Sequence, residues 1–281
     1  MKHILAILRE LFSKKLLVRE TETMVMTGEQ VLSYSAYGET DSALRAAYLF
    51  HAYWASQSFS GCRRVVDLGC GPANQLLLLA KLNPQIQFVG VDLSGDMLKL
   101  AQKNKESLGI NNVEFVVDDI TQLSKLSDKS FDGVFSSVAL HHVSTEKDLY
   151  AVFNQVERIL TGPKALYITD FILLKNPKSI DYLLELNWQQ PELFRLEYLN
   201  SLKASFDLAH FKKAHELVHI NFKIYYTKLA NFFMIMKTPS LMVQENMKFN
   251  QLFKEEVRKL STKNLQTYKD LSLMFRVSGL K

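Results

Sequence analysis

Acidic residues and glycines follow short apolar segments in the first half of the chain. The run Val65-Val66-Asp67-Leu68 leads into Gly69 and Gly71, Asp92 closes a second apolar segment, and Asp119 closes a third. Glycine has no Cβ and lets backbone approach a ligand, whereas carboxylates accept hydrogen bonds from hydroxyl and amino groups. An acid at Asp67 suits positive charge better than a pyrophosphate. These residue types predict a site for a ligand that carries hydroxyl groups and a positive charge.

A dinucleotide-binding loop is the nearest alternative for this segment. That fingerprint needs a third glycine three positions after Gly71, and Asn74 stands there. The spacing therefore argues against a dinucleotide.

The pattern Asp67-x-Gly69-x-Gly71 resembles the first motif of class I S-adenosylmethionine-dependent methyltransferases, with Ala73 where that family usually has a further glycine. The resemblance implies that Asp92 accepts from the ribose hydroxyls and Asp119 from the adenine amino group. Two further segments resemble sequences of this family. The segment Val138-Ala139-Leu140-His141-His142-Val143 is similar to the family's sequence where the chain passes beneath the methionyl group. The segment around Tyr34 is similar to the sequence that precedes the core domain. The cofactor-binding residues so implied are Tyr34, Asp67, Gly69, Gly71, Asp92, Leu93, Met97, Asp119, Ile120, Ser137 and His142.

The reaction implied is methyl transfer from S-adenosylmethionine by in-line displacement, in which the protein mainly aligns donor and acceptor and excludes water. A nitrogen acceptor needs no strong base, whereas an oxygen or carbon acid does. His142, His141 and Asp170 are the candidate catalytic residues. The alternative, that both histidines only cap a helix or line the cofactor cavity, stays open.

A second pattern, His215-Glu216-Leu217-Val218-His219, spells a zinc-protease motif. The apolar alternation that begins at Ile220 indicates a strand, which places His219 beyond the helix end. We therefore interpret the motif as a chance match and expect no metal site.

Strand and helix patterns alternate through the middle of the chain. Strands are predicted around Val65–Leu68, Ile86–Asp92, Val113–Val117, Phe131–Ser137 and Ala165–Phe171, with helices over Gln75–Leu82, Gly95–Leu108 and Thr145–Leu160 and a turn at Thr161–Pro163. A hairpin of His219–Tyr226 and Ala230–Lys237 follows. The predicted fold is α/β: a Rossmann-like, seven-stranded, mostly parallel sheet with an antiparallel C-terminal hairpin.

Segments outside this alternation divide the chain. An amphipathic helix is predicted over Met1–Glu20, which packs over the protein's own cofactor cleft or lies on a membrane or partner. The predicted division is a helical N-terminal cap (1–60), a methyltransferase domain (61–238) with a helical acceptor-side insertion (172–206), and a helical C-terminal extension (239–281).

Composition sets the remaining expectations. The chain has 281 residues, 47% of them hydrophobic, a net charge of +5 and two cysteines. This suits one large domain with additions, reduced thiols and a cytoplasmic setting. No apolar run reaches the roughly 18 residues of a transmembrane helix.

The favoured function is methyl transfer to a small molecule, because no nucleobase-amine signature and no appended nucleic-acid module is evident. RNA and protein acceptors stay open, as does a homodimer through the N-terminal cap or the C-terminal extension. A protein that binds the cofactor without transferring methyl is the rival hypothesis.

Overall fold

The computed structural model covers residues 1–281 and describes residues 8–15, 17–21, 44–227, 232–240 and 247–280. Tyr34 lies outside the described residues, so its predicted role stays a prediction.

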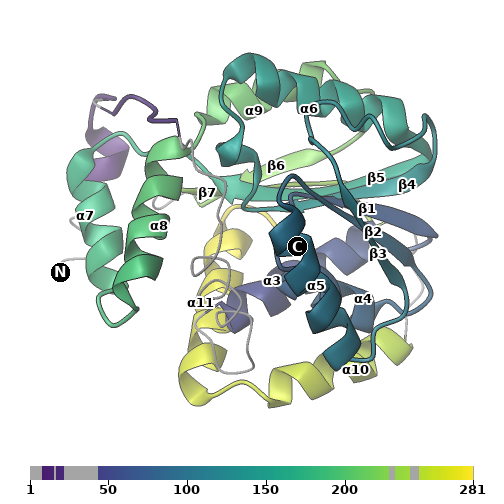
Figure 1. Ribbon diagram of the computed structural model, residues 1–281. Helices are drawn as coiled ribbons and strands as arrows, with labels where there is room; N and C mark the ends of the chain where they lie inside the picture. The colour runs from purple at the N-terminus through teal and green to yellow at the C-terminus, as the bar shows by residue number, and fades with distance from the viewer. Residues whose placement is uncertain (1–7, 16, 22–43, 228–231, 241–246, 281) are drawn as a thin grey trace.

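Within the described residues, seven strands form one sheet in the order β3-β2-β1-β4-β5-β7-β6 (Figure 1). The first five in chain order are parallel, and β7 runs antiparallel between β5 and β6. The strands are β1 (Arg64–Leu68), β2 (Gln87–Asp92), β3 (Val113–Val117), β4 (Phe131–Ser137), β5 (Leu160–Phe171), β6 (Lys223–Tyr226) and β7 (Phe233–Lys237). The predicted sheet, with its antiparallel hairpin, is confirmed, but the first hairpin strand begins at Lys223 rather than at His219.

Helices cover both faces of the sheet, which explains why apolar side chains lie on both faces of the central strands. Val65 faces a core shared with α3, α4 and α11, whereas Val66 and Leu68 face a core shared with α6 and α9. The helices are α3 (Arg45–Ser58), α4 (Asn74–Leu82), α5 (Gly95–Ser107), the 3₁₀ turn η1 (Leu140–His142), α6 (Glu146–Ile159), α7 (Pro177–Leu186), α8 (Glu192–Ala204), α9 (Leu208–Glu216), α10 (Met247–Arg258) and α11 (Thr262–Val277).

Local capping fixes where two of these helices begin. The Ser94 hydroxyl accepts from the Met97 amide at the start of α5. Thr145 and Asp148 form a reciprocal capping box at the start of α6. The predicted positions of both helices are confirmed to within one residue at each end.

The N-terminal segment departs from its prediction. Helix is present over 8–12, but the following described residues up to Thr21 are irregular. We call residues 9–15 and 17–21 the N-terminal strap. Its backbone amides donate hydrogen bonds to other segments of the chain. The Leu17 amide donates to the Lys175 carbonyl at 3.3 Å, and the Glu20 amide donates to the Lys203 carbonyl at 3.0 Å. These partners replace the hydrogen bonds of a continuous helix.

The start of β5 also differs from its prediction. The strand begins at Leu160, and the predicted turn at 161–163 is an irregularity inside it, where the register with β4 shifts. Gly162 has φ 60°, a left-handed conformation that glycine adopts without steric cost. The residues that predicted a turn before β5 therefore form a bulge within this strand instead.

The α7–α8 hairpin (177–204) follows the carboxyl end of β5 and stands beyond the strand ends, with the N-terminal strap beside it (Figure 1). Helices α10 and α11 pack against α3. Phe275 of α11 stacks on Phe50 of α3 with ring centroids 5.4 Å apart. In the described part of the chain, no helix combines the length and apolar character needed to cross a bilayer.

Candidate functional site

The carboxyl ends of β1, β2 and β3 meet at one edge of the sheet. In the register, Asp67 lies opposite Gly90, two residues before Asp92, and Asp92 lies opposite Val117, two residues before Asp119. Parallel neighbours bring successive strand ends together, so three acids far apart in sequence lie along one edge.

The loop after β1 is shaped by its two glycines. Gly69 has φ 76°, and a Cβ placed there would lie 2.5 Å from the Cβ of Ala139, so no other residue fits without moving the chain. Gly71 has φ 52°, and a Cβ there would meet no atom within 4 Å. The backbone at Gly71 therefore borders open space that a ligand can occupy.

Asp67 is buried beside this loop. Its Oδ1 has no hydrogen-bond partner among the described residues. Burial, and then the negative charge of Asp92, raise the pKa of the Asp67 carboxyl well above its usual range. A cationic ligand at this point would satisfy the oxygen and favour the ionised form.

Asp92 links the ends of β1 and β2. Its Oδ2 accepts from the Gly71 amide and its Oδ1 from the Ser94 amide, both at 2.8 Å. Burial raises the pKa of Asp92, and these hydrogen bonds and the nearby His142 oppose that rise. Each oxygen has a second lone pair for a ligand hydroxyl. The adjoining Leu93 is 59% exposed, which leaves an apolar surface beside the carboxylate.

The two acids after β3 have different tasks. Asp118 is buried and accepts from the Lys125 amide and the Ser124 hydroxyl; burial opposes its ionisation, but these bonds hold its pKa below the usual value. Asp119 is half-buried and uses Oδ1 to accept from Thr121. Asp118 thus orders the loop, and Asp119 is the more accessible acid.

The remaining predicted cofactor residues lie around the same edge. Ile120 is half-buried after Asp119, and Met97 is buried in the first turn of α5. Ser137 ends β4, and its hydroxyl donates to Gln75 Oε1 at 2.7 Å.

Gln75 is a residue that the sequence analysis missed. It lies in the first turn of α4 and is 8% exposed, and its Nε2 has no partner among the described residues. A polar residue at the start of the otherwise leucine-rich segment 75–82 was the available signal. Its contact with Ser137, 62 positions away, was not readable from spacing.

Two of the three candidate catalytic residues are in direct contact. The His141 Nδ1 donates to Asp170 Oδ1 at 2.7 Å, and the His141 backbone amide donates to Asp170 Oδ2 at 3.1 Å. Both side chains are buried. His142, the next residue of η1, is exposed, and its ring centroid lies 4.1 Å from that of His141.

The zinc-protease pattern does not form a two-histidine helical face. Helix α9 ends at Glu216, and His219 is 89% exposed beyond it, as the strand pattern predicted. His215 packs its ring edge-on against Phe222 instead. Among the described residues, no three His, Cys, Asp or Glu side chains are grouped closely enough to hold a metal ion.

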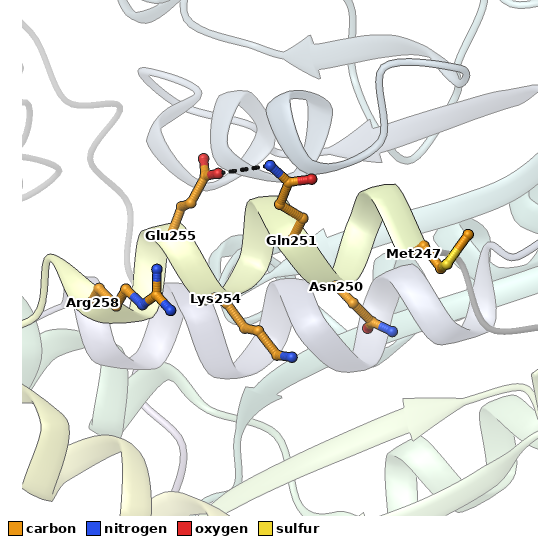
Figure 2. Close-up of a pocket in the computed structure, with 6 residues that line it drawn as sticks. All are labelled: Met247, Asn250, Gln251, Lys254, Glu255 and Arg258. Carbon is orange, nitrogen blue, oxygen red and sulfur yellow. Dashed lines mark hydrogen bonds between the residues drawn. The ribbon is translucent and has the colours of Figure 1, made fainter.

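Two cavities lie away from the strand ends. One of about 430 Å³ runs along α10, where Figure 2 shows Asn250, Lys254 and Arg258 projecting from one side of the helix. Another of about 400 Å³ adds Tyr53 and Tyr268. Helix α10 packs on α3 and α4, outside the layer that covers the sheet. Neither cavity includes Asp67, Asp92 or Asp119.

The strand-end groups fit S-adenosylmethionine. A buried, unsatisfied carboxylate oxygen at Asp67 suits the positive charge of the donor, and the Asp92 and Asp119 carboxylates suit ribose hydroxyls and an adenine amino group. Open space at Gly71 and the exposed Leu93 provide room and an apolar contact. The chemistry of this donor set therefore matches the cofactor.

Comparisons with known proteins agree with this geometry. A family model described as a methyltransferase domain matches residues 60–230. A malonyl-[acyl-carrier protein] O-methyltransferase of Legionella pneumophila is 35% identical over 107 residues, which is 38% of this chain and 36% of that protein. A ribosomal RNA small subunit methyltransferase G of Shewanella is 28% identical over 148 residues, 48% of this chain and 70% of that protein.

The match to an uncharacterised Rickettsia prowazekii protein is 39% identical over 80 residues, 28% of this chain, and spans 14% of that protein. The chain thus spans about a third or less of the length of these Legionella and Rickettsia relatives.

Solved structures share the fold. A methyltransferase from Aquifex aeolicus, described as S-adenosylmethionine-dependent, has a TM-score of 0.54 at 16% identity and covers 76% of this chain and 100% of its own. The plantazolicin methyltransferase BamL, solved with a triazolic desmethylPZN analogue and S-adenosylhomocysteine, has a TM-score of 0.56 at 19% identity and covers 84% of this chain and 87% of its own. With the domain matched over residues 60–230 and its sheet and strand-end acids in place, the chain belongs to the class I S-adenosylmethionine-dependent methyltransferase family.

Proposed function

We propose that this chain binds S-adenosylmethionine at the carboxyl edge of β1, β2 and β3 and transfers its methyl group to a small-molecule acceptor. The observation that carries the proposal is the buried Asp67 Oδ1, which has no partner among the described residues and adjoins the open glycine loop. The bound cofactor supplies a methyl group on a sulfonium, whose thioether is an excellent leaving group.

The residues divide the binding between them. Asp92, which keeps the Gly71 amide in place, would hold the ribose hydroxyls, and Asp119 would hold the adenine amino group. Asp67 Oδ1 would accept from the ammonium of the methionyl group. Gln75 Nε2, oriented by Ser137, would donate to the carboxylate of that same group. A charged acceptor oxygen and an amide donor, both buried, together match an α-amino acid zwitterion.

Residues 141–144, which we call the histidine turn, supply the proton chemistry. The Asp170 carboxylate accepts hydrogen bonds from the Nδ1 and the backbone amide of His141, which fixes the orientation of this residue. The exposed His142 is the group that an oxygen acceptor can reach, and its imidazole would hold the proton that the acceptor gives up. His141 and Asp170 hold it in position.

The α7–α8 hairpin supports a small-molecule acceptor. It stands beyond the strand ends, where ligands of open α/β sheets bind, and Lys263 at the start of α11 approaches its turn at Gln189 with 3.5 Å between Nζ and Oε1. These elements border the acceptor side and help to keep water from the transferring methyl group.

Calorimetry tests the binding half of the proposal. Wild-type protein should bind S-adenosylhomocysteine, and Asp92→Asn should weaken that binding by about 1–3 kcal/mol, because hydrogen bonds to a charged group are lost. Asp96→Asn is the matched control, since the Asp96 carboxylate is exposed and pairs with Lys99. Equal affinities of the Asp92 variant and wild type would contradict the ribose assignment.

Label transfer tests the catalytic half. Protein, methyl-labelled S-adenosylmethionine and either metabolite extracts or RNA are incubated together, and labelled products are separated. A labelled small molecule is the expected product, whereas labelled RNA would contradict the acceptor class. Binding without any labelled product would favour a cofactor-binding protein without methyl transfer.

A further inference from the structure

Arg19 of the N-terminal strap makes an unusual number of contacts for a residue so far from the predicted site in sequence. Its guanidinium donates four hydrogen bonds to backbone carbonyls: Nε to Ala204 at 2.7 Å, Nη1 to Ser144 at 2.7 Å, and Nη2 to Val143 at 2.6 Å and to His141 at 3.0 Å. The guanidinium carbon also lies 3.8 Å from the centre of the Phe206 ring.

Three of these carbonyls belong to the histidine turn, residues 141–144. Asp170 holds this turn through the amide and ring of His141. Arg19 holds it through the His141 carbonyl and the two carbonyls that follow His142. The backbone of the turn is therefore held by two side chains, Asp170 on an amide and Arg19 on three carbonyls.

The fourth carbonyl, that of Ala204, lies at the C-terminal end of α8. Arg19 thus joins three parts of the molecule: the strap, the α7–α8 hairpin and the histidine turn. Its planar fork of donors can serve all four acceptors at once, which a lysine ammonium cannot do.

Burial lowers the pKa of Arg19, while the charges of Glu146, Asp148 and Asp170 favour its cationic form. The cation thus lies among three acids and over the buried Phe206 ring. These surroundings suit a fixed cation rather than a freely moving surface side chain.

We propose that Arg19 is a positioning residue for methyl transfer, which sets the histidine turn relative to the donor and couples it to the α7–α8 hairpin. The inference rests on the proposed function, because it assigns the turn a place beside the transferring methyl group. Arg19 itself touches neither donor nor acceptor.

A purely structural role would be to dock the strap. Other groups already do that: Lys15 forms an ion pair with Asp207, and Lys203 pairs with Glu20 at 3.1 Å. The Lys15–Asp207 pair holds the same strap without contacting the histidine turn. Lys15 is therefore the matched control for Arg19.

The test is nuclear magnetic resonance of the imidazole nitrogens in full-length protein labelled with ¹⁵N-histidine. His141→Gln and His142→Gln assign the two signals. Arg19→Met should shift both signals, Arg19→Lys should shift them less, and Lys15→Met should leave them in place. Calorimetry with S-adenosylhomocysteine should still detect binding in all three variants, since the strand-end acids are untouched.

Unchanged imidazole signals in Arg19→Met would overturn the inference, and so would equal shifts in Lys15→Met, because docking of the strap would then suffice. If Arg19→Met fails to fold, the Arg19→Lys variant provides the test. Imidazole signals of Arg19→Lys that coincide with those of wild type would then contradict the inference. A wild-type protein that does not bind S-adenosylhomocysteine would contradict the proposed function, while the imidazole signals would still show whether Arg19 sets the conformation of the histidine turn.

Discussion

Two buried polar atoms on residues that flank the glycine loop, one in β1 and one in the first turn of α4, are the most unusual feature at the scale of single residues. Asp67 Oδ1 and Gln75 Nε2 both lack a partner among the described residues, and burying a polar group without one is costly. Asp67 offers an acceptor oxygen, whose ionised form a cationic ligand would favour, and Gln75 offers a donor. Their cost is offset if a ligand with both an ammonium and a carboxylate binds between them.

Gln75→Leu tests this pairing. The variant should bind S-adenosylhomocysteine about tenfold or more weakly, because a hydrogen bond to a charged carboxylate is lost. Binding of 5′-methylthioadenosine, which has no amino acid group, should not change. Gln102→Leu is the control, since Gln102 is exposed on α5 and donates to Glu106. A parallel loss of affinity for both ligands in Gln75→Leu would mean that the substitution disturbs the loop as a whole.

At the scale of elements, one carboxylate joins the C-terminal helices to the rest of the protein. Glu256 of α10 is 2% exposed and pairs with Arg45 of α3, with Lys81 of α4 at 2.8 Å and with Lys259 at 2.8 Å. Burial alone would raise its pKa, but the hydrogen bonds from the lysines and the charge of Arg45 bring the pKa of Glu256 down to about 2.

Glu256→Gln should lower the free energy of unfolding at neutral pH by about 2–3 kcal/mol. Removing one partner of a buried ion pair is strongly destabilising, and the partial exposure of both lysines reduces the loss. Glu255→Gln is the neighbouring control, because Glu255 is exposed and accepts from Gln251. Urea titrations of the two variants and wild type provide the comparison.

The same carboxylate gives an acid-dependent signature. The pKa of Glu256 is lower in the folded protein than the ordinary value of 4.5, so its contribution is fully present above pH 4.5. It is lost as pH falls from 4.5 toward about 2. The stability difference between wild type and Glu256→Gln should therefore shrink over that range, and a constant difference would contradict the ion-pair assignment.

At the scale of the whole molecule, a buried histidine connects the layer of helices to the centre of the sheet. His51 of α3 and Tyr167 of β5 share a hydrogen bond of 2.8 Å between Nδ1 and the phenol oxygen. Burial lowers the pKa of His51 to about 3 and raises that of Tyr167. The folded protein therefore keeps His51 neutral at pH values where the unfolded chain protonates it.

The expected result is a loss of stability in mild acid. Between pH 6.5 and about 3 the unfolded state binds one proton more at His51, so this group lowers the free energy of unfolding by about 1.4 kcal/mol per pH unit as pH falls. His51→Asn should remove that slope, measured by urea unfolding from pH 6.5 to 5. The exposed His219→Asn serves as control and should keep it.

The predicted domain division at residues 60 and 238 stays a proposal, as does a homodimer. Residues of α3, α10 and α11 share one hydrophobic core with β1 and α4. Analytical ultracentrifugation would measure the oligomeric state directly.

The sequence by itself determined the sheet, the glycine loop and the acids at the strand ends. These features depend on local rules: apolar runs make strands, glycine allows the tight loop, and the carboxyl ends of parallel strands lie along one edge. Asp67, Asp92 and Asp119 could therefore be placed together without knowing any contact. Their register in the structure confirms that placement.

Only the tertiary structure decided which distant residues meet. Gln75 with Ser137, His141 with Asp170, and Arg19 with the histidine turn are pairs separated by 62, 29 and 122 or more positions. The strap after residue 12 is irregular because the α7–α8 hairpin and the histidine turn supply its hydrogen-bond partners, although its apolar spacing predicted a helix. The periodicity of apolar side chains indicates which face of a single helix or strand is buried. Contacts between distant residues depend instead on how several elements pack against each other.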